Sequence, residues 1–188
     1  MLKSKKINIG ISIGDLNGIL IEIILKVLSE SHLYEKCNFI IYSSLDLIVK
    51  QQDFFKITTL PLKKIDSLDK IASDQINIKE VFSSSKFEFG KNDKEISANG
   101  IISFKEAVED AKSKKIDILI TAPINKSLSY SSSFKFLGHT DYLKNLFNID
   151  PMMLMVSDNL KLGLLTEHIP LKDVVSEITT KKVIQKIK

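Results

Sequence analysis

Two kinds of apolar segment alternate along this chain, and that alternation constrains the fold more than any other feature. Short runs rich in branched apolar residues, typical of β-strands, occupy 7–13, 38–44 and 116–123, the last of which we expect to be buried. Longer segments with helical spacing lie at 18–31 and 103–115. Strands that alternate with helices predict an α/β fold with a mixed, mostly parallel sheet.

The region between these segments is less regular. A short helix is expected over 45–52. From 53 to 96 the pattern shows only β-like pieces, at 56–60 and 76–82, separated by polar stretches. The role of this region is left open.

The last quarter of the chain shows a second set of elements. We expect a helix over 139–147, with Thr140 as a candidate N-cap. Two strands over 152–157 and 160–168 are joined by an Asp-Asn pair typical of a tight turn. The segment 171–188 is expected to be helical, and its apolar stripe still continues where the sequence ends, which indicates a fold truncated at its C-terminal side.

Size and charge exclude several classes of protein. A chain of 188 residues suffices for one domain or one and a fraction, and 44% hydrophobic residues exclude a disordered chain. No apolar run reaches the roughly 20 residues that a membrane helix needs. Cys37 is the only cysteine, so no intramolecular disulfide forms and a cytoplasmic location is expected. The net charge of +4 comes from dispersed lysines, so a small-molecule partner is favoured over nucleic acid.

Two motifs follow predicted strands, where ligands bind in open α/β sheets. The stretch "ISIGDLNGI" (11–19) is a strand, a turn and a helix start; it lacks the GxGxxG spacing of a dinucleotide site, and a structural turn is favoured over a ligand loop. The stretch "TAPINK" (121–126) places Asn125 and Lys126 just after a strand. By itself it fits a ligand site and a solvated surface turn equally well.

Histidines are few, and two of them lie in suggestive positions. His139 begins a predicted helix beside Thr140, where both could contact a polar ligand or serve only as a helix start. His168 follows a predicted strand, but a catalytic zinc needs about three protein donors, and two histidines 29 residues apart do not define such a site. On spacing alone, a structural His168 is favoured. His32 is expected at the surface near a helix end.

Taken together and in order, "GDLNGI", "TAPINK", "GHTDYL" and "HIPLKDV" resemble the 4-hydroxythreonine-4-phosphate dehydrogenase family, the NAD-dependent enzymes of pyridoxal phosphate biosynthesis. The resemblance covers about residues 7–188. It implies an architecture like that of isocitrate and isopropylmalate dehydrogenases, with two α/β domains and a cleft between them. This chain would be the N-terminal portion, with the internal domain boundary left open and the remainder of the second domain absent.

The resemblance also implies roles for individual residues. His139 and Thr140 would contact the phosphorylated substrate, and His168 would be one of three histidine ligands to a divalent metal such as zinc or magnesium. The other two ligands and most NAD contacts would lie beyond position 188. No residue is assigned as the catalytic acid or base. The family is homodimeric, so a homodimer is expected of the full-length protein.

One motif departs from the family pattern. The family reads Gly-Ile-Gly-Pro-Glu where this chain has Gly18-Ile19-Leu20-Ile21-Glu22. The loss of the second glycine and the proline puts a close backbone approach to a ligand in doubt. Asp15 and Gly18 are therefore left out of the expected site.

The implied reaction is the oxidation and decarboxylation of 4-phosphohydroxy-L-threonine to 3-amino-2-oxopropyl phosphate, with NAD as the hydride acceptor. The 188-residue chain is expected to be inactive by itself, because it supplies one metal donor. Two alternatives remain: a related dehydrogenase for another phosphorylated four-carbon hydroxy acid, and a non-catalytic binding module on the same fold.

Overall fold

The computed structural model describes residues 5–83, 86–129, 134–136 and 138–187. The chain divides into two compact units, Met1–Lys135 and Phe136–Lys188, and each is described by itself. No helix in the described ranges is both long enough and apolar enough to cross a membrane.

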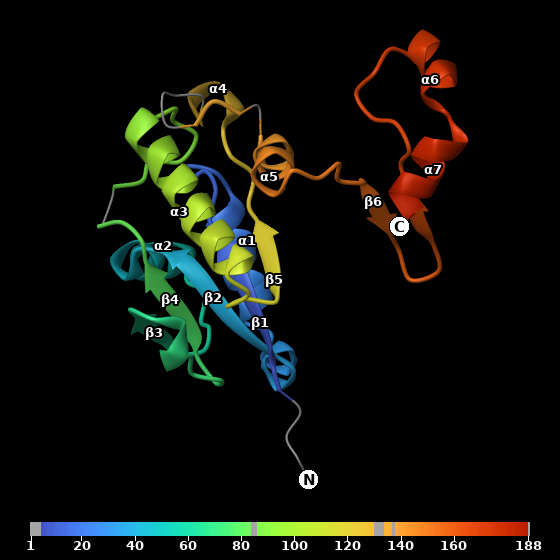
Figure 1. The fold of residues 1–188 in the computed structure, drawn as a ribbon. Helices are drawn as coiled ribbons and strands as arrows, with labels where there is room; N and C mark the ends of the chain where they lie inside the picture. Colours follow the sequence, from blue (N-terminus) through green and yellow to red (C-terminus); the bar gives the residue numbers. More distant parts are fainter. Residues whose placement is uncertain (1–4, 84–85, 130–133, 137, 188) are drawn as a thin grey trace. The chain divides into compact units, whose positions relative to one another are not determined.

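The first unit is built on a parallel sheet of five strands (Figure 1). Its strands are β1 (Ile7–Ser12), β2 (Cys37–Ser43), β3 (Leu62–Ile65), β4 (Ile76–Glu80) and β5 (Ile118–Thr121). Their order across the sheet is β3-β4-β2-β1-β5, and all four pairings are parallel. The α/β class with a mostly parallel sheet is thereby confirmed.

Helices cover both faces of this sheet because each parallel pairing needs a crossover connection. The helices are α1 (Leu20–Leu28), α2 (Leu45–Phe55), α3 (Lys94–Lys112) and the short α4 (Lys126–Ser129), with 3-10 turns η1 (Ser31–Glu35) and η2 (Leu68–Lys70). The core that contains α1 and α2 residues includes Ile9 and Ile11 of β1, whereas Ala107 of α3 packs with Tyr42 on the opposite face. Thus α1 and α2 share one face, and α3 crosses the other (Figure 1).

A buried polar cluster links α3 to the sheet. The Tyr42 hydroxyl donates to Asp110 Oδ2 at 3.0 Å, and Lys79 Nζ donates to the same oxygen at 2.6 Å. Burial and the neighbouring Asp110 carboxylate raise the pKa of Tyr42. Asp110 of α3 thus accepts hydrogen bonds from Tyr42 of β2 and Lys79 of β4, and these bonds fix the position of α3 on the sheet.

Several expected elements differ from the structure. The helix predicted over 18–31 ends at Leu28 and is followed by a separate 3-10 turn, and 56–60 contains no strand. The helix predicted over 103–115 begins earlier, at Lys94, because the Asp93 side chain caps it by accepting from the N–H groups of Glu95 and Ile96.

The strand expected over 116–123 is β5, but it is not buried. Ile118 is 46% exposed and Ile120 is 47% exposed. The reason is position: β5 is the outermost strand of the sheet, beside β1. A run of branched apolar residues predicts a strand, but it does not show whether that strand lies in the middle of the sheet or at its edge.

The second unit comprises α5 (His139–Phe147), β6 (Leu154–Val156), β7 (Lys161–Gly163), α6 (Leu171–Glu177) and α7 (Thr180–Ile187). Strands β6 and β7 form the expected antiparallel hairpin, closed by a hydrogen bond from Ser157 N to Leu160 O. The segment expected as one helix over 171–188 is divided in two near Ile178. None of the described residues of this unit is buried, so it has no core of its own.

Tyr34 gives the first unit a measurable dependence on alkaline pH. Its side chain is buried, and its hydroxyl donates to Leu28 O at 2.8 Å. Burial raises the pKa of Tyr34 from 10.0 to about 12. Because the folded state favours the neutral phenol, the associated stability is present below pH 10 and is lost as the pH rises through about 12.

We therefore expect the free energy of unfolding to fall by roughly 3 kcal/mol between those pH values on account of this group alone. The measurement is denaturant unfolding at a series of pH values, for the wild type and for Tyr34→Phe. The variant should show a shallower decline with pH. Equal slopes in the two proteins would contradict the assignment.

Candidate functional site

The loop after β1 is held against the end of β5 by a close backbone contact. Gly14 has φ +62°, and a Cβ at this position would lie 2.3 Å from Pro123 O. Asp15 N donates to the same carbonyl oxygen at 3.0 Å. Only glycine can adopt this left-handed conformation without strain and also fit where there is no room for a Cβ.

Helix α3 approaches the same loop from the other side. A Cβ on Gly100 would lie 2.3 Å from Gly14 O. Three segments that are distant in sequence therefore meet backbone to backbone, at Gly14, Gly100 and Pro123. This arrangement explains two of the chain's seven glycines as packing requirements.

Asn17 ties the rest of the loop to the segment before α3. Its Nδ2 donates to Lys91 O at 2.9 Å, and its Oδ1 accepts from Glu88 N at 2.8 Å. Gln51 Nε2 donates to Leu16 O at 3.1 Å, which joins the loop to α2 as well. The polar groups of this loop are thus used within the fold, as the interpretation of a structural turn requires.

The start of α1 departs from the family pattern at Leu20 and Ile21 and agrees with it at Glu22. Leu20 is half-buried at the first helical position, and Glu22 lies in the first turn with its carboxylate 2.5 Å from Lys26 Nζ. A carboxylate in the first turn interacts favourably with the helix dipole and opposes a second anion there. Asp15 and Gly18 were not expected in the site, and this geometry gives no reason to include them.

The residues that follow β5 lie near the loop that follows β1, because β1 and β5 are parallel neighbours and their carboxyl ends lie on the same side of the sheet. Asn125 Nδ2 donates to Asn92 Oδ1 at 2.9 Å, and Asn125 Oδ1 accepts from Ser127 Oγ at 2.7 Å. Lys126 is exposed at the start of α4. The first unit therefore has the Asn125 amide and the Lys126 ammonium group near the carboxyl ends of its strands.

In the second unit, His139 is the first residue of α5 and is half-buried, whereas Thr140 is exposed. The prediction that Thr140 caps this helix is wrong. The helix spans His139–Phe147, as expected, and Gly138 occupies the N-cap position without a side-chain hydrogen bond. The Thr140 hydroxyl lies instead in the first turn.

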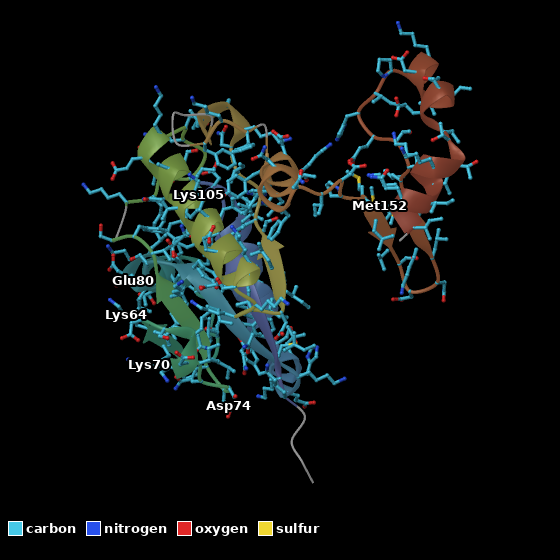
Figure 2. The ribbon with its side chains drawn as sticks, in the orientation of Figure 1. Lys64, Lys70, Asp74, Glu80, Lys105 and Met152 are labelled. Carbon is cyan, nitrogen blue, oxygen red and sulfur yellow. The ribbon has the colours of Figure 1, made fainter. Side chains whose placement is uncertain are left out.

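A cavity of about 230 Å³ adjoins this helix. It is lined by Thr140, Leu143, Pro151, Met152, Met153 and Glu167, of which Met152 is labelled in Figure 2. The cavity brings Thr140 together with Glu167, the residue before His168, while His139 and His168 are not among its lining residues. Glu167 and the two methionines were not expected. The sequence signal for Glu167 was its place directly before the "HIPLKDV" motif.

His168 has an unusual backbone. Its φ is +54°, in the left-handed region that favours glycine. His168 follows the hairpin and is exposed. Such a conformation costs about 1–3 kcal/mol for a non-glycine residue and is commonly found at functional sites. Lys56, Lys114 and Asn148 also have positive φ, so the backbone conformation by itself assigns no role to His168.

The donors of a metal centre are not assembled in the described part of the chain. No group of three or more His, Cys, Asp and Glu side chains there could hold a metal ion. One imidazole does not bind a catalytic metal by itself. The residues present do not fit a complete metal site, and His168 is at most one donor of a set.

An ion pair fixes α7 beside the start of the hairpin. Lys186 Nζ lies 2.7 Å from Asp150 Oδ2 and also donates to Pro151 O at 2.7 Å. The hydrogen bond from Lys186 lowers the pKa of the Asp150 carboxyl. Pro151 lines the cavity, so this pair holds one wall of it.

Comparison with known proteins places these features in a family. The family model described as "Pyridoxal phosphate biosynthetic protein PdxA" matches residues 35–188. A 4-hydroxythreonine-4-phosphate dehydrogenase from Sulfurihydrogenibium sp. (strain YO3AOP1) is 34% identical over 97% of this chain and 56% of its own length. A protein named putative D-threonate 4-phosphate dehydrogenase from Clostridium botulinum is 29% identical over 100% of this chain and 57% of its own length.

A solved structure agrees in fold. The crystal structure of a 4-hydroxythreonine-4-phosphate dehydrogenase from Burkholderia phymatum matches with a TM-score of 0.85 and 25% identity, over 98% of this chain and 57% of that one. The chain thus spans a little over half the length of the relatives it matches. The family resemblance expected from the motifs is confirmed: the chain belongs to the PdxA family of pyridoxal phosphate biosynthetic proteins.

Proposed function

We propose that this chain is the N-terminal portion of an NAD-dependent dehydrogenase that oxidises and decarboxylates 4-phosphohydroxy-L-threonine to 3-amino-2-oxopropyl phosphate. The observation that carries the proposal is the family match over 35–188, which includes the "TAPINK", "GHTDYL" and "HIPLKDV" motifs. Hydride leaves the carbon of the secondary alcohol for NAD, and the resulting β-keto acid loses carbon dioxide. The remainder of the catalytic machinery would come from the portion of the family's chain outside the match.

Within this proposal, the second unit contributes substrate contacts. Thr140 lines the cavity, and its hydroxyl can donate to or accept from a phosphate oxygen. His139 lies beside it at the helix start and would contact the same group. Asp141 lies in the first turn of α5 and Glu167 lines the cavity, so the proposed phosphate contact relies on the Thr140 hydroxyl and His139 and not on the helix N-terminus.

His168 would be a ligand of a divalent metal whose other donors lie outside this chain. Zinc and magnesium are both compatible with the proposal, because one imidazole does not select between them. The completed protein would act as a cytoplasmic homodimer, for which the support is the family resemblance and the single cysteine. Sedimentation of the completed protein would test the oligomeric state.

A second candidate substrate is D-threonate 4-phosphate, another phosphorylated four-carbon hydroxy acid. The observation that favours this substrate is the Clostridium botulinum relative named for it. That relative is 29% identical to this chain, close to the 34% of the Sulfurihydrogenibium relative named for 4-hydroxythreonine 4-phosphate. The two substrates differ in having an amino or a hydroxyl group beside the carboxylate. Comparison of kcat/KM for the two compounds would decide between them.

The 188-residue chain alone is expected to show no NAD reduction with either substrate in the presence of zinc or magnesium. The chain joined to the portion of the Sulfurihydrogenibium relative that the match leaves out is expected to be active. The measurement is NADH absorbance under identical conditions. Turnover by the homogeneous 188-residue chain would refute the requirement for a second portion. Tight substrate binding by that chain, with no activity in the joined protein, would favour the non-catalytic binding module.

A further inference from the structure

The cavity beside α5 has a single charge, that of Glu167, among the described residues that line it. The other lining residues are the neutral Thr140 and four apolar residues, Leu143, Pro151, Met152 (labelled in Figure 2) and Met153. A volume of about 230 Å³ is small for a ligand pocket, so the cavity fits a short metabolite and not a whole dinucleotide. A lone carboxylate in such a place needs an explanation.

Glu167 has no protein partner for its charge. Within the described ranges, no hydrogen bond or ion pair involves its carboxylate. Lys186, which holds the Pro151 wall of the cavity, is paired with Asp150 instead. Glu167 is half-buried, and a carboxylate that is partly removed from water beside apolar groups is unfavourable unless a cation or a hydrogen-bond donor meets it. The cavity therefore favours a ligand that carries a positive charge.

The two polar residues of the cavity recognise different chemical groups. The Thr140 hydroxyl can donate to a phosphate oxygen, whereas the Glu167 carboxylate repels a phosphate. An ammonium group would be attracted by Glu167 and could donate a charge-assisted hydrogen bond to it. Because both residues line one cavity, they fit a single small ligand that carries a phosphate and an ammonium group.

The two candidate substrates of the proposed function differ in this respect. Beside its carboxylate, 4-phosphohydroxy-L-threonine has an ammonium group, and D-threonate 4-phosphate has a hydroxyl group. A hydroxyl can also donate a hydrogen bond to a carboxylate, but it carries no charge. Coulomb attraction by Glu167 therefore favours the amino acid over the compound with a hydroxyl in its place.

We propose that Glu167 is a specificity-determining residue, which binds the ammonium group of a phosphorylated amino acid and disfavours the analogue with a hydroxyl group in its place. The inference relies on the proposed function and deepens it, because it chooses between the two candidate substrates. Glu167→Gln tests it directly, since glutamine keeps the size of the side chain and an acceptor oxygen and removes the charge.

The test measures binding by the chain joined to the remaining portion of the Sulfurihydrogenibium relative. Two probes lack the hydroxyl that is oxidised in the substrates: O-phospho-L-homoserine, which has the ammonium group, and 2-hydroxy-4-phosphobutanoate, which has a hydroxyl in its place. Titration calorimetry gives the Kd of each. We expect the wild type to prefer O-phospho-L-homoserine by about tenfold or more, and Glu167→Gln to lose most of this preference. A general loss of folded protein would weaken the binding of both probes and leave their ratio unchanged.

Glu177→Gln is the matched control, because it removes the same charge from an exposed residue of α6 that does not line the cavity. It should keep the wild-type preference. Three results would overturn the proposal: no preference or no binding in the wild type, an unchanged ratio in Glu167→Gln, or an equal change in Glu177→Gln. A preference that depends on Glu167, without NAD reduction by either substrate, would contradict only the proposed function. Turnover of 4-phosphohydroxy-L-threonine with an unchanged ratio would overturn only the role of Glu167.

Discussion

Gly100→Ala is expected to destabilise the first unit by about 2–3 kcal/mol, although alanine is the better helix former. A methyl group at position 100 would meet Gly14 O at 2.3 Å and Gly14 C at 2.9 Å, and both are backbone atoms. Alanine in place of glycine within a helix contributes about 1 kcal/mol in the opposite direction. The steric cost exceeds the gain in helix propensity because neither α3 nor the Gly14 loop can move away.

The reason lies in what surrounds the contact. Gly14 is held on its other side by Pro123, whose carbonyl oxygen accepts from Asp15 N. Helix α3 is fixed by buried Phe104 and by Asp110, which accepts from Tyr42 and Lys79. Relief of the clash would separate α3 from the loop and disturb one of these sets of contacts.

The measurement is urea unfolding followed by circular dichroism, because the chain has no tryptophan. Gly90→Ala is the control: Gly90 has φ +75°, but a methyl group added there would have no atom within 4 Å. It should cost only the backbone strain, about 1–2 kcal/mol. A Gly100→Ala protein as stable as the wild type would show that the two backbones can separate freely.

The same contact shows why part of the fold could be predicted from sequence and part could not. Strands β1, β2 and β4 and the hairpin β6–β7 were predicted because their apolar patterns are local. The first half of α3 was missed, since Gly100 and the polar residues near it weaken the helical pattern. The glycine is required by the distant Gly14, and a tertiary requirement of this kind leaves no local signal.

The candidate site divides in a similar way. Motif order identified His139, Thr140 and His168, and the roles assigned to them remain predictions. Sequence spacing could not show that Thr140 and Glu167 line one cavity, because the contact depends on how the hairpin follows α5. It also could not show that His168 adopts a left-handed backbone, because this conformation is uncommon for residues other than glycine and has no local signal in this sequence.

The left-handed backbone at His168 leads to the second large prediction, which separates a metal-binding role from a structural one. In the chain joined to the remaining portion of the Sulfurihydrogenibium relative, His168→Ala should lower kcat/KM by on the order of 100-fold or more and reduce the bound metal measured by elemental analysis. His168→Gly should lose activity and metal equally. It should nevertheless be more stable than His168→Ala by about 1 kcal/mol, because glycine adopts φ +54° without strain.

If the imidazole is a metal ligand, the two variants differ in stability but are equally low in activity and metal content. A structural histidine would instead couple stability and activity, so that the more stable glycine variant would also be the more active one. His32→Ala provides the control, since His32 lies in η1 and its side chain is 70% exposed. It should leave both activity and metal content unchanged. Full activity and metal content in His168→Ala would exclude His168 as a ligand, and the strained backbone at this position would then need another explanation.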